Sequence, residues 1–196
     1  PLVNSEKGIS HIELVFRDDA LTGNITDISG AQCRNAVPDR SVVKIKQGSA
    51  LEFALNAACG GSATSDIFRT PPAVENIVSM GSRPEDFELI KTTSGMAIAS
   101  NGTAEHASTP EKGDNALWKT LGLLAAYNGV ICSKYIENIY DVLCTPLATQ
   151  KLGVYVDDPK SGDTTMCLSQ AEIKDGALRL IADFRLPLGV SAEFVA

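Results

Sequence analysis

The chain has 196 residues, and its 24 acidic and 17 basic side chains give a formal charge of −7. Hydrophobic residues make up 44% of the chain and charged residues 21%, a composition that fits a globular protein and excludes a disordered one. The negative charge gives no electrostatic basis for binding nucleic acid or an anionic membrane surface. No segment approaches the roughly 20 continuous apolar residues of a membrane-spanning helix. The length fits one domain or two small ones.

Histidines and cysteines limit the metal chemistry that the chain can support by itself. The two histidines, His11 and His106, are too few for a histidine-rich metal site. The five cysteines are an odd number and include no C-x-x-C pair, which argues against both a structural zinc site and a disulfide framework. They are therefore interpreted as small buried thiols in a reducing, cytoplasmic compartment.

The first half of the chain predicts strands around one helix. Short runs of alternating polarity, bounded by turn residues, predict three strands, at residues 9–17, 25–30 and 41–46. A helix is expected over residues 50–58, between a capping Ser49 and a stop at Gly60-Gly61. Residues 60–72 are rich in Gly, Ser, Thr and Pro and predict a loop, and residues 72–80 predict a short helix that opens with proline.

The second half predicts two more strands, two helices and a final hairpin. Strands are expected at residues 87–93 and 95–101, joined at Ser94-Gly95. A loop at 102–113 then leads into two helices, at residues 114–127 and 132–143. The first helix is expected to end at Asn128-Gly129 and the second at Thr145-Pro146. The last hairpin is expected to pair residues 164–173 with 177–184, with its turn at 174–176.

The order of these elements predicts an α+β fold, in which helices pack on one face of a mostly antiparallel sheet. A strand–strand–helix pattern occurs in both halves of the chain. We therefore expect a two-lobed sheet built from ferredoxin-like strand-helix units. The first lobe is expected over about residues 7–100 and the second over about residues 101–189.

The segment 102–116 carries the strongest functional signal. It reads G-T-A-E-H-A-S-T-P-E-K-G-D-N-A, so His106 lies in a loop of small residues between a predicted strand and a predicted helix. Small neighbours permit close approach by a ligand or by another chain. A lone histidine is more often an ordinary surface or core residue than a functional one. The spacing of the residues around His106 is therefore needed to decide whether this histidine is functional or ordinary.

That spacing resembles the lid-domain signature of the di-zinc exopeptidases related to carnosinase, aminoacylase and succinyl-diaminopimelate desuccinylase, and in particular of the dipeptidase V (PepV-like) group. Three other segments agree in order along the chain. Glu6-Lys7-Gly8 resembles the junction with the catalytic domain of the family, and residues 30–39 resemble a segment with an asparagine before Val-Pro-Asp. Residues 182–189 resemble a strand that ends in R-x-P. Four segments in order make the resemblance fairly specific.

The resemblance implies roles for three residues. His106 would stabilise the oxyanion, Arg185 would hold the C-terminal carboxylate of a dipeptide, and Asn35 would help to hold the substrate or the oxyanion. From the residues alone, Arg185 falls opposite the apolar face of its strand, where a solvated arginine is the ordinary interpretation. Asn35 falls in a polar turn, where asparagine is common for backbone reasons. His11 is expected to be an ordinary exposed strand residue, and Trp118 is expected to pack in the core.

The zinc ligands of such peptidases are missing from the sequence, which contains neither an H-x-D pair nor two adjacent glutamates. The chain also begins at Pro1 rather than at a methionine and has no signal-peptide pattern. We therefore expect a lid-domain fragment that binds no metal and is inactive alone. Its parent would be a monomeric, cytoplasmic zinc-dependent dipeptidase whose catalytic domain holds two zinc ions. The alternative is a stand-alone, non-enzymatic α+β ligand-binding or assembly module, which leaves the His106 loop and Arg185 unexplained.

Overall fold

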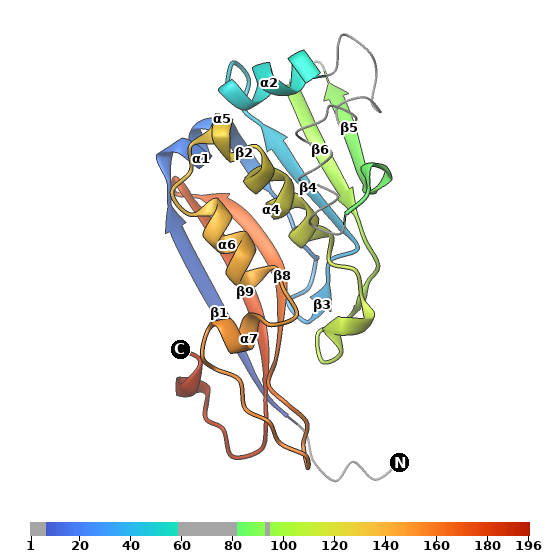
Figure 1. Ribbon diagram of the computed structural model, residues 1–196, viewed down its shortest axis with the longest axis vertical. Helices are drawn as coiled ribbons and strands as arrows, with labels where there is room; N and C mark the ends of the chain where they lie inside the picture. Colours follow the sequence, from blue (N-terminus) through green and yellow to red (C-terminus); the bar gives the residue numbers. More distant parts are fainter. Residues whose placement is uncertain (1–6, 59–81, 93–94) are drawn as a thin grey trace.

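The computed structural model describes residues 7–58, 82–92 and 95–196 of the chain (Figure 1). The predicted loop at 60–72, the predicted helix at 72–80 and the turn at Ser94 lie outside the described residues. The described residues form helices and antiparallel sheets, which confirms the predicted α+β class. The two-lobed, ferredoxin-like arrangement stays a prediction.

A three-stranded antiparallel sheet brings the two ends of the chain together. Its order is β1 (Gly8–Arg17), β9 (Ala177–Leu186) and β8 (Thr165–Lys174). The turn between β8 and β9 contains Asp175 and Gly176, with φ of 52° and 68°. Positive φ at two successive turn residues matches the twist of a hairpin, and the predicted hairpin is confirmed. The first strand of the chain therefore lies in one sheet with the last two.

A second antiparallel sheet has four strands and meets the first sheet at β2 and β8. Its order is β2 (Ile25–Ile28), β4 (Arg40–Ile45), β6 (Gly95–Asn101) and β5 (Phe87–Thr92). The Ala31 N–H donates to the Ser169 carbonyl oxygen at 2.7 Å, just beyond the end of β2. Ser169 lies where the register of β8 shifts, so a bulge there turns a carbonyl towards the neighbouring sheet.

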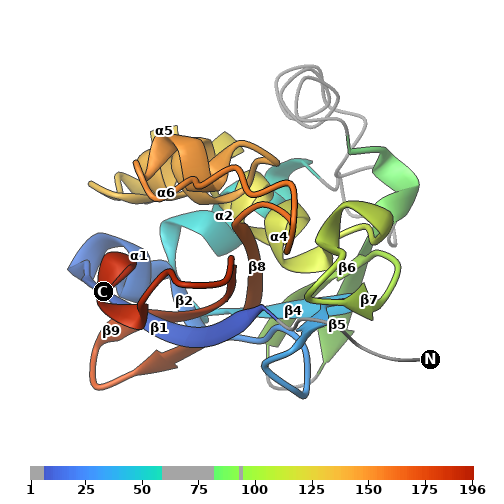
Figure 2. The same cartoon turned by 90° about the horizontal axis from the view of Figure 1, so that it is seen from below.

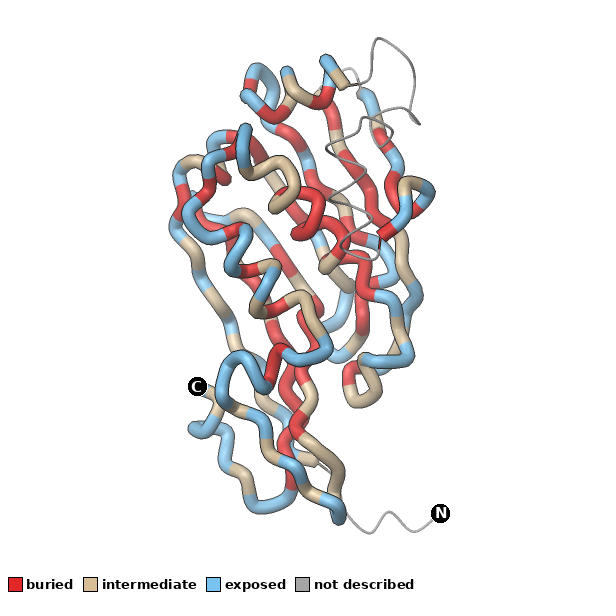
Figure 3. Tube along the Cα trace, in the orientation of Figure 1, coloured by how far each residue is buried: buried red, intermediate tan, exposed pale blue. Residues whose placement is uncertain are grey.

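The longer helices lie on one face of the strands, as predicted, and Figure 2 shows α4, α5 and α6 together on that side. The helices are α1 (Asp19–Asn24), α2 (Ala50–Ala58), α4 (Ala116–Ala126), α5 (Asn128–Ile131), α6 (Ile136–Leu143) and α7 (Ala148–Lys151). The short 3-10 helices are η2 (Pro84–Asp86), η3 (Pro110–Lys112) and η4 (Ala192–Phe194). Buried residues concentrate where α4 crosses the strands, and they include Leu117, Leu121 and Leu124 of α4 (Figure 3). No helix in the described part of the chain is both long and apolar enough to cross a membrane.

The prediction of a helix over residues 132–143 is wrong at its start, because α6 begins at Ile136. Cys132 has a left-handed backbone, with φ of 59°, and ends α5. The Asp18 carboxylate accepts from the Ser133 hydroxyl at 2.5 Å and from the Lys134 N–H at 3.0 Å. These contacts hold the segment to the start of α1 and keep it out of the helix. The end predicted for the first helix is confirmed to within two residues, because α4 stops at Ala126, but the short helix α5 that begins at Asn128 was not predicted.

Candidate functional site

His106 lies on a two-stranded ribbon formed by β3 (Ala36–Val37) and β7 (Glu105–His106), here called the β3–β7 ribbon. Ala36 pairs with His106 in antiparallel register. The Ala107 N–H donates to the Asn35 carbonyl oxygen at 2.9 Å and extends the pairing by one residue. Two of the predicted site residues, Asn35 and His106, are therefore brought together by backbone hydrogen bonds between distant parts of the chain.

Two glycines of the 102–116 segment allow the chain to fold tightly beneath the ribbon. A Cβ at Gly102 would lie 2.0 Å from the Asp114 carbonyl oxygen. A Cβ at Gly113 would lie 2.9 Å from Val37 Cγ1 and 3.0 Å from Glu105 Cβ. Real Cβ contacts are not this short, so both positions require glycine. The glycines at these two positions of the 102–116 segment therefore have a structural role.

Asn115 joins the end of this segment to α4 and to the sheet. Its side-chain oxygen accepts from the Leu117 and Trp118 N–H groups at 3.0 and 3.2 Å, so Asn115 caps the helix. Its amide nitrogen donates to the Leu168 carbonyl oxygen of β8 at 2.8 Å. The cap and the sheet contact together fix where the loop ends.

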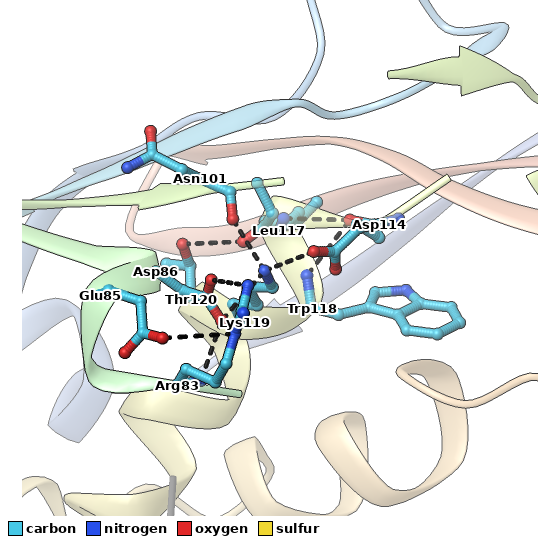
Figure 4. A network of polar contacts seen from close by, with 11 residues as sticks. Arg83, Glu85, Asp86, Asn101, Asp114, Leu117, Trp118, Lys119 and Thr120 are labelled. Carbon is cyan, nitrogen blue, oxygen red and sulfur yellow. Dashed lines mark hydrogen bonds and ion pairs between the residues drawn. The ribbon is translucent and has the colours of Figure 1, made fainter. Parts of the chain in front are cut away.

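Lys119 of α4 holds the same loop from below (Figure 4). Its Nζ donates to the Asn101 carbonyl oxygen at 2.9 Å and to Asp114 Oδ2 at 2.6 Å, and it lies 3.2 Å from Asp86 Oδ2. Burial raises the pKa of Asp86, but the Arg83 N–H and the Lys119 ammonium outweigh it, and the net shift is downward. The loop that carries His106 is thus fixed by ionic and backbone contacts.

The His106 side chain is exposed, and one of its ring nitrogens is held by Ser108. The Ser108 N–H donates to Nδ1 at 3.2 Å, and the Ser108 Oγ lies 2.7 Å from the same atom. Because Nδ1 accepts, the neutral ring carries its proton on Nε2, a tautomer assigned from this hydrogen-bond pattern. Neither His106 Nε2 nor the exposed Asn35 amide has a hydrogen-bond partner among the described residues. Both groups are free to bind a ligand.

Arg185 is buried, with 7% of its surface exposed, and it binds Asp183 with two hydrogen bonds. Its Nε donates to Asp183 Oδ1 at 2.6 Å, and its Nη2 donates to Oδ2 at 3.0 Å. Asp183 has no exposed surface, and His11 Nε2 lies 3.0 Å from its Oδ2. The predicted placement of Arg185 on the face opposite Leu180 is confirmed, but the ordinary interpretation of a solvated arginine is wrong. A carboxylate two residues away on the same strand face keeps the guanidinium buried.

Sequence reasoning missed Asp183 and the contact made by His11. Asp183 and Arg185 share a face because side chains two residues apart point to the same side of a strand. His11 is the cross-strand partner of Asp183 in the β1–β9 register, so it also lies on that face. The alternation of polar residues along β9 could have identified Asp183. The pairing of the first and last strands was needed to find His11.

A small apolar cluster of Val37, Ala107 and Cys167 packs the β3–β7 ribbon against β8. The Cys167 thiol donates to the Ala36 carbonyl oxygen at 3.7 Å. Burial, with a further contribution from the Asp183 charge, raises the pKa of the Cys167 thiol to about 12, so the thiol is neutral. Cys167 is also the cross-strand partner of Asp183. The ribbon and the Arg185–Asp183 pair therefore lie on the same face of the three-stranded sheet.

The described residues include no group of three or more histidine, cysteine, aspartate or glutamate side chains that could hold a metal ion. The four cysteines within the described ranges are all free thiols. A scan against protein-family models matches no family, and a search of curated proteins matches no protein. Function is therefore inferred from the geometry of the residues above.

Proposed function

We propose that the chain is the lid domain of a PepV-like di-zinc dipeptidase, in which His106 stabilises the oxyanion and Asn35 and Arg185 bind the substrate. The observation that carries this proposal is the free Nε2–H of His106, on a ribbon whose next residue, Ala107, is hydrogen-bonded to the Asn35 backbone. The described residues do not fit a metal centre, so in the proposal both zinc ions belong to a catalytic domain outside this chain. A cytoplasmic, monomeric parent and a two-lobed lid are parts of the same proposal.

His106 suits the stabilisation of a developing negative charge. Peptide hydrolysis places that charge on the carbonyl oxygen of the scissile bond, and zinc ions held by the absent catalytic domain would supply polarisation of the carbonyl and activation of water. The imidazole is held by Ser108 at Nδ1, so its Nε2–H is oriented before substrate arrives. A preoriented donor of this kind contributes about 3 kcal/mol to lowering the barrier. The Asn35 amide, from the neighbouring segment, offers further N–H donors to the substrate.

Arg185 suits recognition of a carboxylate. A guanidinium group has five N–H donors, and the two hydrogen bonds to Asp183 use two of them. The other three have no partner among the described residues. Because Asp183 already fixes the plane of the group, little side-chain freedom is lost when a carboxylate binds. In the proposal this carboxylate is the free C-terminus of the dipeptide.

The proposal is tested in the full-length protein that the gene encodes. His106→Ala should lower kcat for dipeptide hydrolysis by about 100- to 1000-fold, the loss typical of an oxyanion donor, with little change in zinc content. Lys134→Ala changes an exposed side chain outside the candidate site and serves as the control, with kcat nearly unchanged. Equal turnover in wild type and His106→Ala would exclude His106 from the mechanism. A parent protein without zinc-dependent dipeptidase activity would refute the whole proposal.

The alternative, a stand-alone non-enzymatic module, makes a different prediction about the gene. A dipeptidase requires H-x-D and Glu-Glu segments upstream of this chain and a histidine downstream of it, whereas a module requires none of these. Reading the gene on both sides of the chain therefore separates the two functions.

A further inference from the structure

Asp183 connects Arg185 to His11 across two strands of the three-stranded sheet. Arg185 Nε and Nη2 donate to the two carboxylate oxygens of Asp183, and His11 Nε2 lies 3.0 Å from Oδ2. A carboxylate only accepts hydrogen bonds, so Nε2 of the neutral imidazole carries the proton, a tautomer assigned from this contact. The three side chains therefore form one line of hydrogen bonds that ends at the unused donors of Arg185.

The burial of this cluster makes its net charge important for any ligand of Arg185. Asp183 has no exposed surface and Arg185 has 7%, so water screens their charges only weakly. With a neutral His11, the guanidinium and carboxylate charges cancel. The His11 side chain is 33% exposed, and its Nδ1 has no partner among the described residues, so Nδ1 can take a proton from solvent. A carboxylate at Arg185 then meets a cluster with a net charge of +1.

The other charged groups that face His11 belong to classes that keep their charge near neutral pH. The groove beside His11 is lined by charged side chains of β1, β8, β9 and the segment after β2, namely Glu13, Arg34, Glu172, Lys174 and Arg179. The 3-10 helix η4, which contacts β1, adds Glu193. Carboxylates, lysines and arginines generally titrate outside the range from about pH 6 to about 8, whereas histidine titrates within it. Burial raises the pKa of the Cys167 thiol to about 12, so the thiol also stays neutral in this range.

We propose that His11 is a positioning residue for Arg185: it orients Asp183 and Arg185, and its protonation tightens the binding of a carboxylate by Arg185. The inference rests on the proposed function for the identity of this carboxylate, the free C-terminus of a dipeptide. Protonation and binding are reciprocal, so a bound carboxylate also favours the protonated imidazole. The affinity for a carboxylate is therefore expected to be higher at pH 6 than at pH 8.

Binding of N-acetyl-L-alanine to the 196-residue chain tests this pH dependence without catalysis. The probe carries the carboxylate of a C-terminal residue and is ionised at both pH values. An NMR titration that follows the Arg185 Nε–H signal should give a Kd at least about 3-fold lower at pH 6 than at pH 8. N-acetyl-L-alaninamide, which lacks the carboxylate, should show no such dependence.

Two variants of His11 separate its charge from its hydrogen bond. His11→Gln keeps an N–H donor but cannot gain a proton, so it should lose most of the pH dependence, which also excludes His106 as the cause. His11→Ala removes the donor as well and should bind the probe at least about 3-fold more weakly than His11→Gln at pH 8. Val15→Thr, at an exposed position of β1, is the matched control and should behave as wild type.

Equal affinity of the wild type at both pH values, or an undiminished pH dependence in His11→Gln, would overturn the proposed effect of protonation. Equal affinity of His11→Ala and His11→Gln at pH 8 would overturn the positioning role.

The full-length protein distinguishes failure of this inference from failure of the proposed function. The kcat/KM ratio between L-alanyl-L-alanine and its amide should rise at least about 3-fold from pH 8 to pH 6, and this rise should be smaller in His11→Gln. An active enzyme with a ratio independent of pH would overturn the role of His11 and leave the dipeptidase function standing. An inactive protein whose chain binds N-acetyl-L-alanine more tightly at pH 6 would refute the dipeptidase function alone.

Discussion

Lys119 and Arg185 are both buried cations, but they differ in how fully their donors are used. The Lys119 ammonium has three N–H donors and three acceptors in reach, from Asn101, Asp114 and Asp86. Its hydrogen-bonding capacity is complete within the protein. Its contacts fix the loop beneath the β3–β7 ribbon, and nothing remains for a ligand. Lys119 is therefore a structural cation.

Arg185 is as deeply buried, yet the described residues use only two of its five donors, both on Asp183. Burial alone thus does not separate a structural cation from one that can bind a ligand. The number of uncommitted donors separates them. Changes to the partners of each cation test this comparison, because they affect stability to different extents.

The largest effect is expected from Asp183→Ala, which leaves the buried guanidinium without its counter-ion. Removing one partner of a buried ion pair typically costs about 3–5 kcal/mol in the free energy of unfolding. Urea denaturation at neutral pH measures this loss. Asp141→Ala is the control, because Asp141 forms an ion pair with Lys151 at 2.9 Å but is 73% exposed. Its loss should cost less than about 1 kcal/mol. Similar losses in the two variants would mean that Arg185 does not depend on Asp183.

The sequence predicts most of the strands because their side chains alternate in polarity, and alternation is a local property. The same alternation correctly assigns Arg185 to the face opposite Leu180. The start of α6 could not be predicted in this way, because it depends on Asp18, more than a hundred residues earlier in the chain. The partner of a side chain across the fold is not encoded in any local pattern.

The candidate site is predictable to a similar extent. The spacing around His106 identifies the loop, and the structure shows why Gly102 and Gly113 belong to that spacing. The β3–β7 ribbon has two residues in each strand, too short to give a periodic signal. The contact of His11 with Asp183 depends on the pairing of strands from opposite ends of the chain. Long-range pairing therefore decides which predicted site residues come together.

A smaller effect is expected from Lys119→Met, which keeps most of the side-chain volume but removes the ammonium. Asp86 loses its buried partner, whereas Asp114 is half exposed and can be hydrated instead. We therefore expect a loss of about 2 kcal/mol in the free energy of unfolding. Lys134→Met, at an exposed position, should change stability by less than about 0.5 kcal/mol. A loss as large as that of Asp183→Ala would show that the number of unused N–H donors does not distinguish the two buried cations in their contribution to stability.

The smallest effect concerns the pH dependence that Asp86 contributes. Its pKa is lowered because the Arg83 N–H and the Lys119 ammonium outweigh its burial, so the folded protein favours the charged form. Its contribution is therefore complete above the unfolded pKa of about 4 and is lost as the pH falls through the lower folded pKa. Urea denaturation should show wild type about 1 kcal/mol more stable than Asp86→Asn at pH 7, with the difference shrinking at pH 3. In the Lys119→Met background this pH-dependent difference should become smaller. If the difference between pH 7 and pH 3 is unchanged in that background, the Arg83 N–H lowers the pKa of Asp86 without help from Lys119. The Asp86–Lys119 contact would then not contribute to stability.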